Sequence, residues 1–354
     1  MGRINSTGRL RKRHAFFPVL FCMAMMSVLP EGAAQAAQPT RGETSEPRQE
    51  VKNTRSLVGE IGFRNAAYDR LKQKYGYPWL YPQAFAIDAD AKEFFVMLGS
   101  ISGQNMWGWV QVYDLDNFKL KSTFSTGQRW REGIVIRRIG GQRFLYTMGN
   151  TSLIRVDVTK LPRDISVLEP EAQPARLFSM MAFDGSRFAL QEPHGPGGFI
   201  GPQKFGLYDE NFRRRASVTL TAPKTDNSAS PSADAKMQGI ASTEDRFFAG
   251  FGGAYLPGVH KKGGKWQGTV MFDRTGAVLS SSLVDPDVMA ASLERLIGYR
   301  PTCVENEGVA IAGDEVYSIW ITLGPKERER PDNAGKGVVL MRELFTAGMD
   351  GGDQ

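Results

Sequence analysis

Paired apolar segments separated by short polar turns recur along the chain. Five segments share this pattern: QAFAIDADAKEFFVML (83–98), EGIVIRRIGGQRFLYTM (132–148), SMMAFDGSRFALQE (179–192), QGIASTEDRFFAGF (238–251) and EGVAIAGDEVYSIW (307–320). In each, Asp, Gly or charged residues separate two strands rich in aromatic or aliphatic side chains. That pattern predicts a β-hairpin, so we expect five hairpins.

A third alternating strand follows each hairpin and usually ends in an aromatic residue and Asp. These strands are VQVYD (110–114), LIRVD (153–157), FGLYD (205–209), TVMFD (269–273) and VVLMR (338–342). The Asp is expected to cap a turn by accepting from backbone NH groups. A fourth strand is predicted after three of them, at KLKSTFST (119–126), RRASVTL (214–220) and AVLSSSLV (277–284).

The repeated unit is therefore four antiparallel strands. The first positions, Gln83, Glu132, Ser179, Gln238 and Glu307, are 49, 47, 59 and 69 residues apart. Four-stranded units of roughly 40–50 residues are typical of propeller blades, and the longer spacings are explained by loops. We predict an all-β protein, a five-bladed β-propeller of four-stranded antiparallel blades. A β-sandwich is the competing architecture, but it does not explain the fivefold register.

Three further elements complete the predicted propeller. The fifth blade has little chain left for an outer strand, so SLVGEIGF (56–63) is expected to close the ring from the amino end and remove a sheet edge. Short helices are expected at 64–75 and 286–297.

The segments Q-G-h-A…F-G-G (238–253), F-D-x-x-G (272–276) and E-G-h-A-h (307–311) resemble the propeller family around teichoic acid biosynthesis protein C. That family includes propeller domains of phage receptor-binding proteins. The resemblance covers most of residues 75–345 and implies the fold, and it carries no catalytic residues over to this chain. Blade three departs from it, with Ser179 and Met180 where Gln or Glu and Gly are expected.

The ends of the chain differ from the propeller. Residues 1–36 have a basic head, an apolar run and the sequence Ala34-Gln35-Ala36, which predicts a secretory signal peptide. The apolar run is shorter than the roughly 20 residues of a membrane span, although an uncleaved anchor is the alternative. Residues 37–55 read as a disordered leader, 56–345 as the propeller and 346–354 as a tail. The expected location is secreted or periplasmic, with no membrane span after cleavage.

The charge and cysteine content of the chain without its signal peptide limit the expected partners and disulfides. The signal carries five Lys or Arg and one Glu, so four of the six net positive charges leave with it. A nucleic-acid partner is therefore not expected. Cys303 is the one remaining cysteine, so no internal disulfide can form. We expect a monomer.

The first positions of the five hairpins are expected to converge at one mouth of the central channel. Glu305 lies just before the fifth member, and the sequence places it on the loop that leads in. Three interpretations remain open. The polar side chains bond one another and water, or the oxygens hold a cation such as Ca²⁺, or Glu132 and Glu307 act as acid and base on a glycan.

Aromatic, basic and histidine residues supply further ligand-binding candidates. Trp79 and Trp130 lie in predicted loops, and Arg131 follows Trp130. Aromatic faces stack on sugar rings, and Arg pairs with acidic groups. We expect Trp109 to pack between blades. His194 and His260 lie in glycine-rich loops, where a metal, a proton-transfer role or plain solvent exposure are alternatives.

Three functions fit these features, because a fold alone does not select among them. The first is an exported propeller that binds a cell-envelope or extracellular glycan at the channel mouth. The second is a glycan-degrading enzyme, a glycoside hydrolase or polysaccharide lyase, that uses Glu132 and Glu307. The third is an envelope propeller that binds other proteins. The chain has no G-x-S-x-G or H-E-x-x-H motif and no cysteine cluster, which favours the first.

Overall fold

The computed structural model describes residues 54–62, 65–76, 80–100, 107–128, 132–149, 152–174, 179–193, 199–223, 235–257, 266–328 and 330–345. Its strands form five sheets, and each sheet is one blade of a five-bladed β-propeller. The predicted fold class is therefore confirmed, and the first four strands of every blade are antiparallel, while blade 1 carries a fifth strand that pairs parallel with its fourth. The predicted signal peptide, almost all of the leader, and the tail lie outside the described residues.

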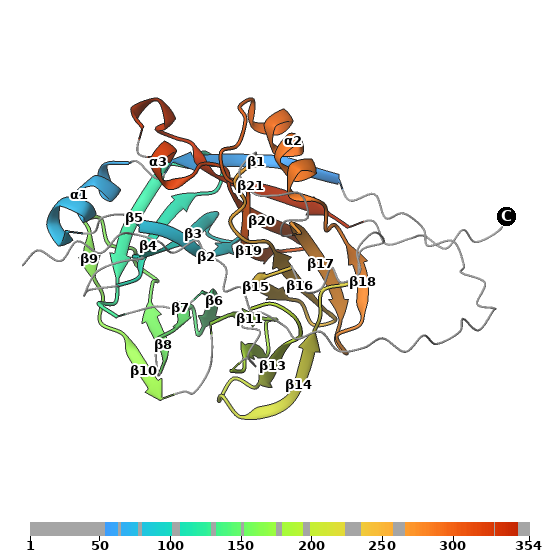
Figure 1. Cartoon of the computed structure of the whole chain (residues 1–354). Helices are drawn as coiled ribbons and strands as arrows, with labels where there is room; N and C mark the ends of the chain where they lie inside the picture. Colours follow the sequence, from blue (N-terminus) through green and yellow to red (C-terminus); the bar gives the residue numbers. More distant parts are fainter. Residues whose placement is uncertain are drawn as a thin grey trace, which may run out of the picture. The chain divides into compact units, whose positions relative to one another are not determined.

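The blades follow one another in chain order (Figure 1). Blade 1 contains β2 (Leu80–Asp88), β3 (Glu93–Ser100), β4 (Trp109–Asp114), β5 (Leu120–Ser125) and β9 (Ser166–Val167). Blade 2 contains β6 (Ile134–Ile139), β7 (Gln142–Met148), β8 (Ser152–Asp157) and β10 (Glu171–Pro174). Blade 3 contains β11 (Met181–Phe183), β12 (Phe188–Gln191), β13 (Gln203–Tyr208) and β14 (Arg214–Leu220). Blade 4 contains β15 (Met237–Ser242), β16 (Arg246–Phe251), β17 (Gly268–Asp273) and β18 (Val278–Ser281). Blade 5 contains β19 (Glu305–Ala312), β20 (Glu315–Ile321), β21 (Gly337–Leu344) and β1 (Thr54–Gly62).

The innermost strands β2, β6, β11, β15 and β19 contact their neighbours all the way round, from β2 through β19 and back to β2. The amino-terminal strand β1 completes the fifth blade by pairing antiparallel with β21, with Leu57 opposite Met341. This is the predicted closure, although β1 begins at Thr54, two residues earlier than the sequence indicated. The two additional residues are Thr54 and Arg55, and Arg55 ties β1 to blade 5 through a buried ion pair with Glu343.

A hydrophobic cluster fills each seam between neighbouring blades. Adjacent residues of the second strand of a blade point to opposite faces, so one residue packs into each flanking seam. Examples of such pairs are Phe94 and Phe95, Leu145 and Tyr146, and Phe247 and Phe248. This alternation explains why the second strands are apolar at nearly every position.

The two ends of the ring differ. The first and second strands of each blade are joined at one end by tight turns, 89–92, 140–141, 184–187, 243–245 and 313–314. The second and third strands of each blade are joined at the other end. The connection is short in blade 2, at 149–151, and longer in the other blades, at 101–108, 192–202, 252–267 and 322–336. We call this second end the mouth end, because the innermost strands begin there.

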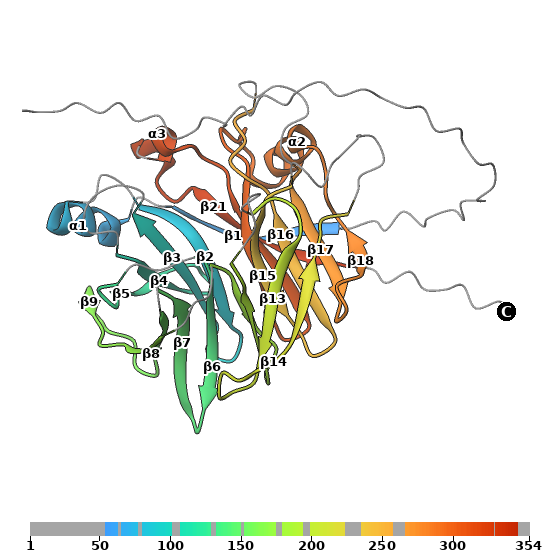
Figure 2. The ribbon, with the colours of Figure 1, turned by 60° about the horizontal axis from the view of Figure 1, so that its bottom comes forward.

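Among the described residues, three α-helices and one short 3-10 helix, Pro331–Asn333, accompany the blades. α1 (Ala66–Tyr75) begins at the N-cap Asn65, whose side chain accepts from the backbone of residues 67 and 68. α2 (Pro286–Ile297) has the predicted bounds, with Asp285 as N-cap. α3 (Pro325–Arg328) was not predicted and belongs to the connection 322–336. Figure 2 shows α2 and α3 at one end of the propeller and the β6–β7 turn at the other. In the described part of the chain, no helix is long and apolar enough to cross a membrane.

Candidate binding face at the channel mouth

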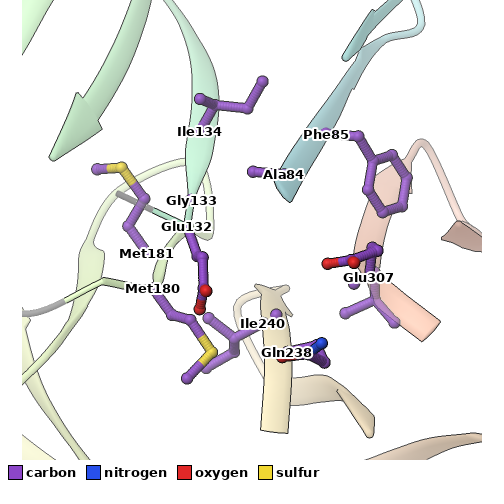
Figure 3. Close-up of a pocket in the computed structure, with 13 residues that line it drawn as sticks. Ala84, Phe85, Glu132, Gly133, Ile134, Met180, Met181, Gln238, Ile240 and Glu307 are labelled. Carbon is purple, nitrogen blue, oxygen red and sulfur yellow. The ribbon is translucent and has the colours of Figure 1, made fainter. Parts of the chain in front are cut away.

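A small cavity on the propeller axis brings together three of the predicted polar residues. Glu132, Gln238 and Glu307 line it together with apolar side chains that include Met180 and Phe85. Figure 3 shows the carboxyl groups of Glu132 and Glu307 directed into the same space from opposite sides. The cavity encloses about 20 Å³, which is room for roughly one water molecule. The channel continues into a second cavity of about 90 Å³, which is lined by residues of the five innermost strands, all of them apolar except Ser242.

Bulges in the innermost strands set the direction of these side chains. The strand register shifts at Gln238 in β15 and at Glu307 in β19, so each residue lies outside the regular pairing. A bulge redirects its side chain, and in these two blades it turns a polar group into the channel. Glu132 reaches the same cavity from just before β6.

Two ring positions behave differently from the prediction. Gln83 also lies in a bulge, but it does not line the cavity, and its amide lies against Gly99 of the neighbouring strand. Ser179 is buried, and its backbone NH donates to Oε1 of Gln191. Met180 and Met181 take its place in the cavity wall. The expected five-membered polar ring is therefore a three-membered group in this cavity.

The glycines that follow the polar residues allow the innermost strands to touch. A Cβ atom on Gly239 would lie 2.8 Å from Cα of Gly308, and one on Gly133 would lie 2.8 Å from the backbone nitrogen of Met181. Gly308 also has φ of 147°, which other residues rarely adopt. Narrow strand spacing at this end keeps the cavity small.

Glu305 lies in β19, not on a loop as predicted, and it is buried. Its Oε1 accepts a hydrogen bond of 2.9 Å from the Gln238 amide, and its Oε2 accepts one from the Tyr81 hydroxyl. The Tyr81 ring is covered by Arg328 of α3, whose guanidinium carbon lies 4.7 Å from the ring centroid. Glu305 thus links blades 1, 4 and 5, and α3 covers this side of the mouth.

The second glutamate of this cluster, Glu307, has a raised pKa. Burial raises the pKa of Glu307 well above its ordinary value, and the nearby carboxylates of Glu305 and Glu132 raise it further. The Lys236 ammonium and the Tyr81 hydroxyl offset part of this effect. Glu307 therefore keeps its proton to a higher pH than an ordinary glutamate, and its carboxyl group can donate a hydrogen bond. A protonated carboxyl near a second carboxylate is also the usual pairing of an acid and a base.

Asn306, between the two glutamates, is a structural residue that the sequence analysis left without a role. Its Oδ1 accepts from the backbone NH of Gly308 across the bulge, at 2.9 Å. Its Nδ2 donates to the carbonyl of Gly268 in blade 4, also at 2.9 Å. The sequence signal is an amide residue directly before Glu-Gly at the start of an innermost strand.

Trp79, Trp130, Arg131, His194 and His260 lie outside the described residues. Their segments nevertheless join strand ends at the mouth end. His194 and His260 belong to the connections 192–202 and 252–267, and Trp79 and Trp130 precede the innermost strands β2 and β6. Trp109 is fully buried, as the sequence predicted. Among the described residues, no group of three or more His, Cys, Asp and Glu side chains is placed to hold a metal ion.

Comparisons with known proteins add little. No family model matches the chain. No curated protein matches it either. Among solved structures, the "Structure of Dos1 propeller" is similar with a TM-score of 0.28 and 11% identity, covering 84% of this chain. The chain spans 63% of the length of that protein. The assignment to the β-propellers rests on the five sheets, and the resemblance to the teichoic acid biosynthesis protein C family stays a prediction.

Proposed function

We propose that this chain is an exported binding propeller that recognises a cell-envelope or extracellular glycan with its mouth end. The observation that carries this proposal is the placement of the long connections. Four of the five connections between second and third strands, 101–108, 192–202, 252–267 and 322–336, are long and share one end. In repeat folds, insertions that gather on one face often form the binding face.

The size of the channel cavity argues for binding outside it. A cavity of about 20 Å³ between Glu132 and Glu307 is far below the roughly 300–1,000 Å³ of ordinary ligand sites. A sugar ring does not fit between the two carboxyl groups in this conformation. The ligand would instead contact the rim, where the connections supply aromatic and basic residues, and the Glu305 and Glu307 cluster would hold the blades in place beneath it.

The glycan assignment is tested with the protein expressed from the full-length sequence and a panel of envelope and extracellular polysaccharides. Affinity is measured for each polymer, and the mixtures are then analysed for shortened or unsaturated products. Saturable binding without products supports a binding propeller. Absence of binding to every polymer would contradict the glycan assignment and favour a protein partner.

A second candidate, glycan cleavage, is favoured by the raised pKa of Glu307 opposite the Glu132 carboxylate. It requires the mouth to open, because the cavity holds about one water molecule. Release of products by the natural chain, lost in both Glu132→Gln and Glu307→Gln, would establish it. Product release that persists in both variants would exclude these two residues as its acid and base.

Export is tested separately. The segment before residue 37 should be removed, so amino-terminal sequencing of secreted material is expected to begin at Ala37 or within a few residues. Recovery of intact Met1 in a membrane fraction would contradict a cleaved signal.

A further inference from the structure

We propose that Tyr75 and Trp107 form a sugar-stacking subsite for an acidic glycan at the mouth end of blade 1. The proposal rests on the glycan-binding function proposed above. The ring centroids of Tyr75 and Trp107 are 5.9 Å apart, with the planes at 53°. Tyr75 also packs on Trp109, at 5.0 Å between centroids.

The rings of Tyr75, Trp107 and Trp109 differ in exposure. The buried ring can serve only packing, whereas the half-buried rings can also contact a ligand. Trp109 is fully buried and anchors the group to the blade core. Tyr75 and Trp107 are half-buried, so each packs against the core cluster that contains Trp109 and keeps part of its surface accessible to solvent. A rigid aromatic surface supported from below is suited to stacking on the apolar face of a sugar ring.

Backbone contacts place this pair where several connections meet. Tyr75 is the last residue of α1, and Gly76 ends the helix in a left-handed conformation. Trp107 ends the connection that precedes β4, and the next NH, of Gly108, donates to the carbonyl of Gln128 at 3.0 Å.

The charge beside the rings selects the ligand class. Lys74 is exposed, and its ammonium lies over the Tyr75 ring, 5.2 Å from the ring centroid. A sugar stacked on the neighbouring Trp107 ring would bring an acidic substituent within reach of Lys74, where a carboxylate or a phosphate would pair with it. The shared chemistry is thus an anionic group on a sugar ring.

The test uses protein expressed from the full-length sequence and three defined polymers. Alginate supplies carboxylates, phosphorylated dextran supplies phosphates, and dextran is the neutral control. Binding is followed by sedimentation with each polymer immobilised and by tryptophan fluorescence. Trp107→Ala is compared with Phe212→Ala, because Phe212 is also a half-buried aromatic residue but lies in the turn between β13 and β14, at the end opposite the mouth.

We expect the natural chain to prefer one or both anionic polymers over dextran. Trp107→Ala should weaken that binding by about tenfold, as expected for the loss of one aromatic contact, whereas Phe212→Ala should not. Trp107→Phe should restore most of the affinity, because it keeps a flat ring. Lys74→Gln should weaken binding by about threefold and reduce its salt dependence, since one exposed charge is lost. Lys92→Gln, an exposed lysine at the opposite end, is its control and should bind normally.

Three results would overturn the inference in distinguishable ways. If the natural chain binds one of the polymers and Trp107→Ala and Lys74→Gln bind it as tightly as their controls, the subsite is wrong and the proposed function stands. If the natural chain binds none of these three polymers but binds another member of the envelope panel, the acidic subsite is wrong and the proposed function stands, whereas loss of binding to the whole panel overturns both proposals. Lys74 is exposed, so its variant tests the subsite even if Trp107→Ala does not fold.

Discussion

The side-chain amide of Gln238 donates a hydrogen bond of 2.9 Å to the carboxylate of Glu305, across the seam between blades 4 and 5. Both side chains are buried. Gln238→Leu should therefore lower the free energy of unfolding by about 2 kcal/mol, because it leaves a buried carboxylate short of a donor. The check is a double-mutant cycle with Glu305→Gln, read by chemical denaturation, in which we expect the two costs to be clearly non-additive. Simple additivity would mean that the two groups do not interact.

Glu307 should make stability depend on pH. Its pKa is raised in the folded state, so the folded protein keeps a proton that the unfolded chain releases. The stability of the natural chain relative to Glu307→Gln is thus highest below the unfolded pKa of about 4.3. It should fall as pH rises from there through the raised pKa.

At neutral pH we expect Glu307→Gln to be more stable than the natural chain, because the amide buries no charge. Denaturation curves from pH 4 to pH 8 provide the measurement. In a Glu132→Gln background the dependence should be weaker, because one of the carboxylates that raise the pKa is gone. A stability difference that does not change with pH would show that Glu307 ionises normally in the fold.

Arg55 should hold the ring closed. Its Nε lies 3.0 Å from each carboxylate oxygen of Glu343, and its Nη2 donates to the Ser282 hydroxyl at 2.7 Å. Arg55→Met leaves Glu343 buried without its cation, which typically costs about 3–5 kcal/mol. The exposed pair of Lys92 and Asp116 is the matched control, and Lys92→Met should cost less than about 1 kcal/mol. Similar melting temperatures for the two variants would argue against closure by β1.

Gly239 should tolerate no side chain. A methyl group there would lie 2.8 Å from Cα of Gly308, in the backbone of the neighbouring blade. Gly239→Ala should lower the free energy of unfolding by about 1–3 kcal/mol, although alanine occupies the equivalent place in blade 1 as Ala84. Thermal melting gives the comparison. An unchanged melting temperature would mean that the inner strands separate easily, which would also make the small cavity a poor argument against channel binding.

Sequence reasoning found the blades because each strand carries a strong local signal. Period-two alternation and polar turns mark the five hairpins, and the same alternation fills the seams with pairs such as Phe94 and Phe95. The short outer strands β9 and β10 were missed because SV and EAQP have no such pattern. α3 was missed for a related reason, since PKER alone does not indicate a helix.

The candidate site was harder to predict because bulges decide it. Gln83, Gln238 and Glu307 occupy equivalent positions in the repeats of blades 1, 4 and 5. The side chain of Gln83 nevertheless lies against Gly99, while the other two face the channel. Glu305 can be buried because Tyr81 and Gln238 donate hydrogen bonds to its carboxylate. These partners lie 224 and 67 residues away along the chain. The local pattern ENEG contains neither partner, so it could not distinguish a loop from a buried strand.

We propose that this propeller binds a glycan with its mouth end. The most direct test is hydrogen exchange of the backbone amides with and without a saturating polymer that binds. We expect slower exchange at the strand ends and connections of the mouth end, 101–108, 192–202 and 252–267, and no change at the tight turns 89–92, 184–187 and 243–245. Protection confined to those tight turns, or to the outer strands alone, would contradict the account.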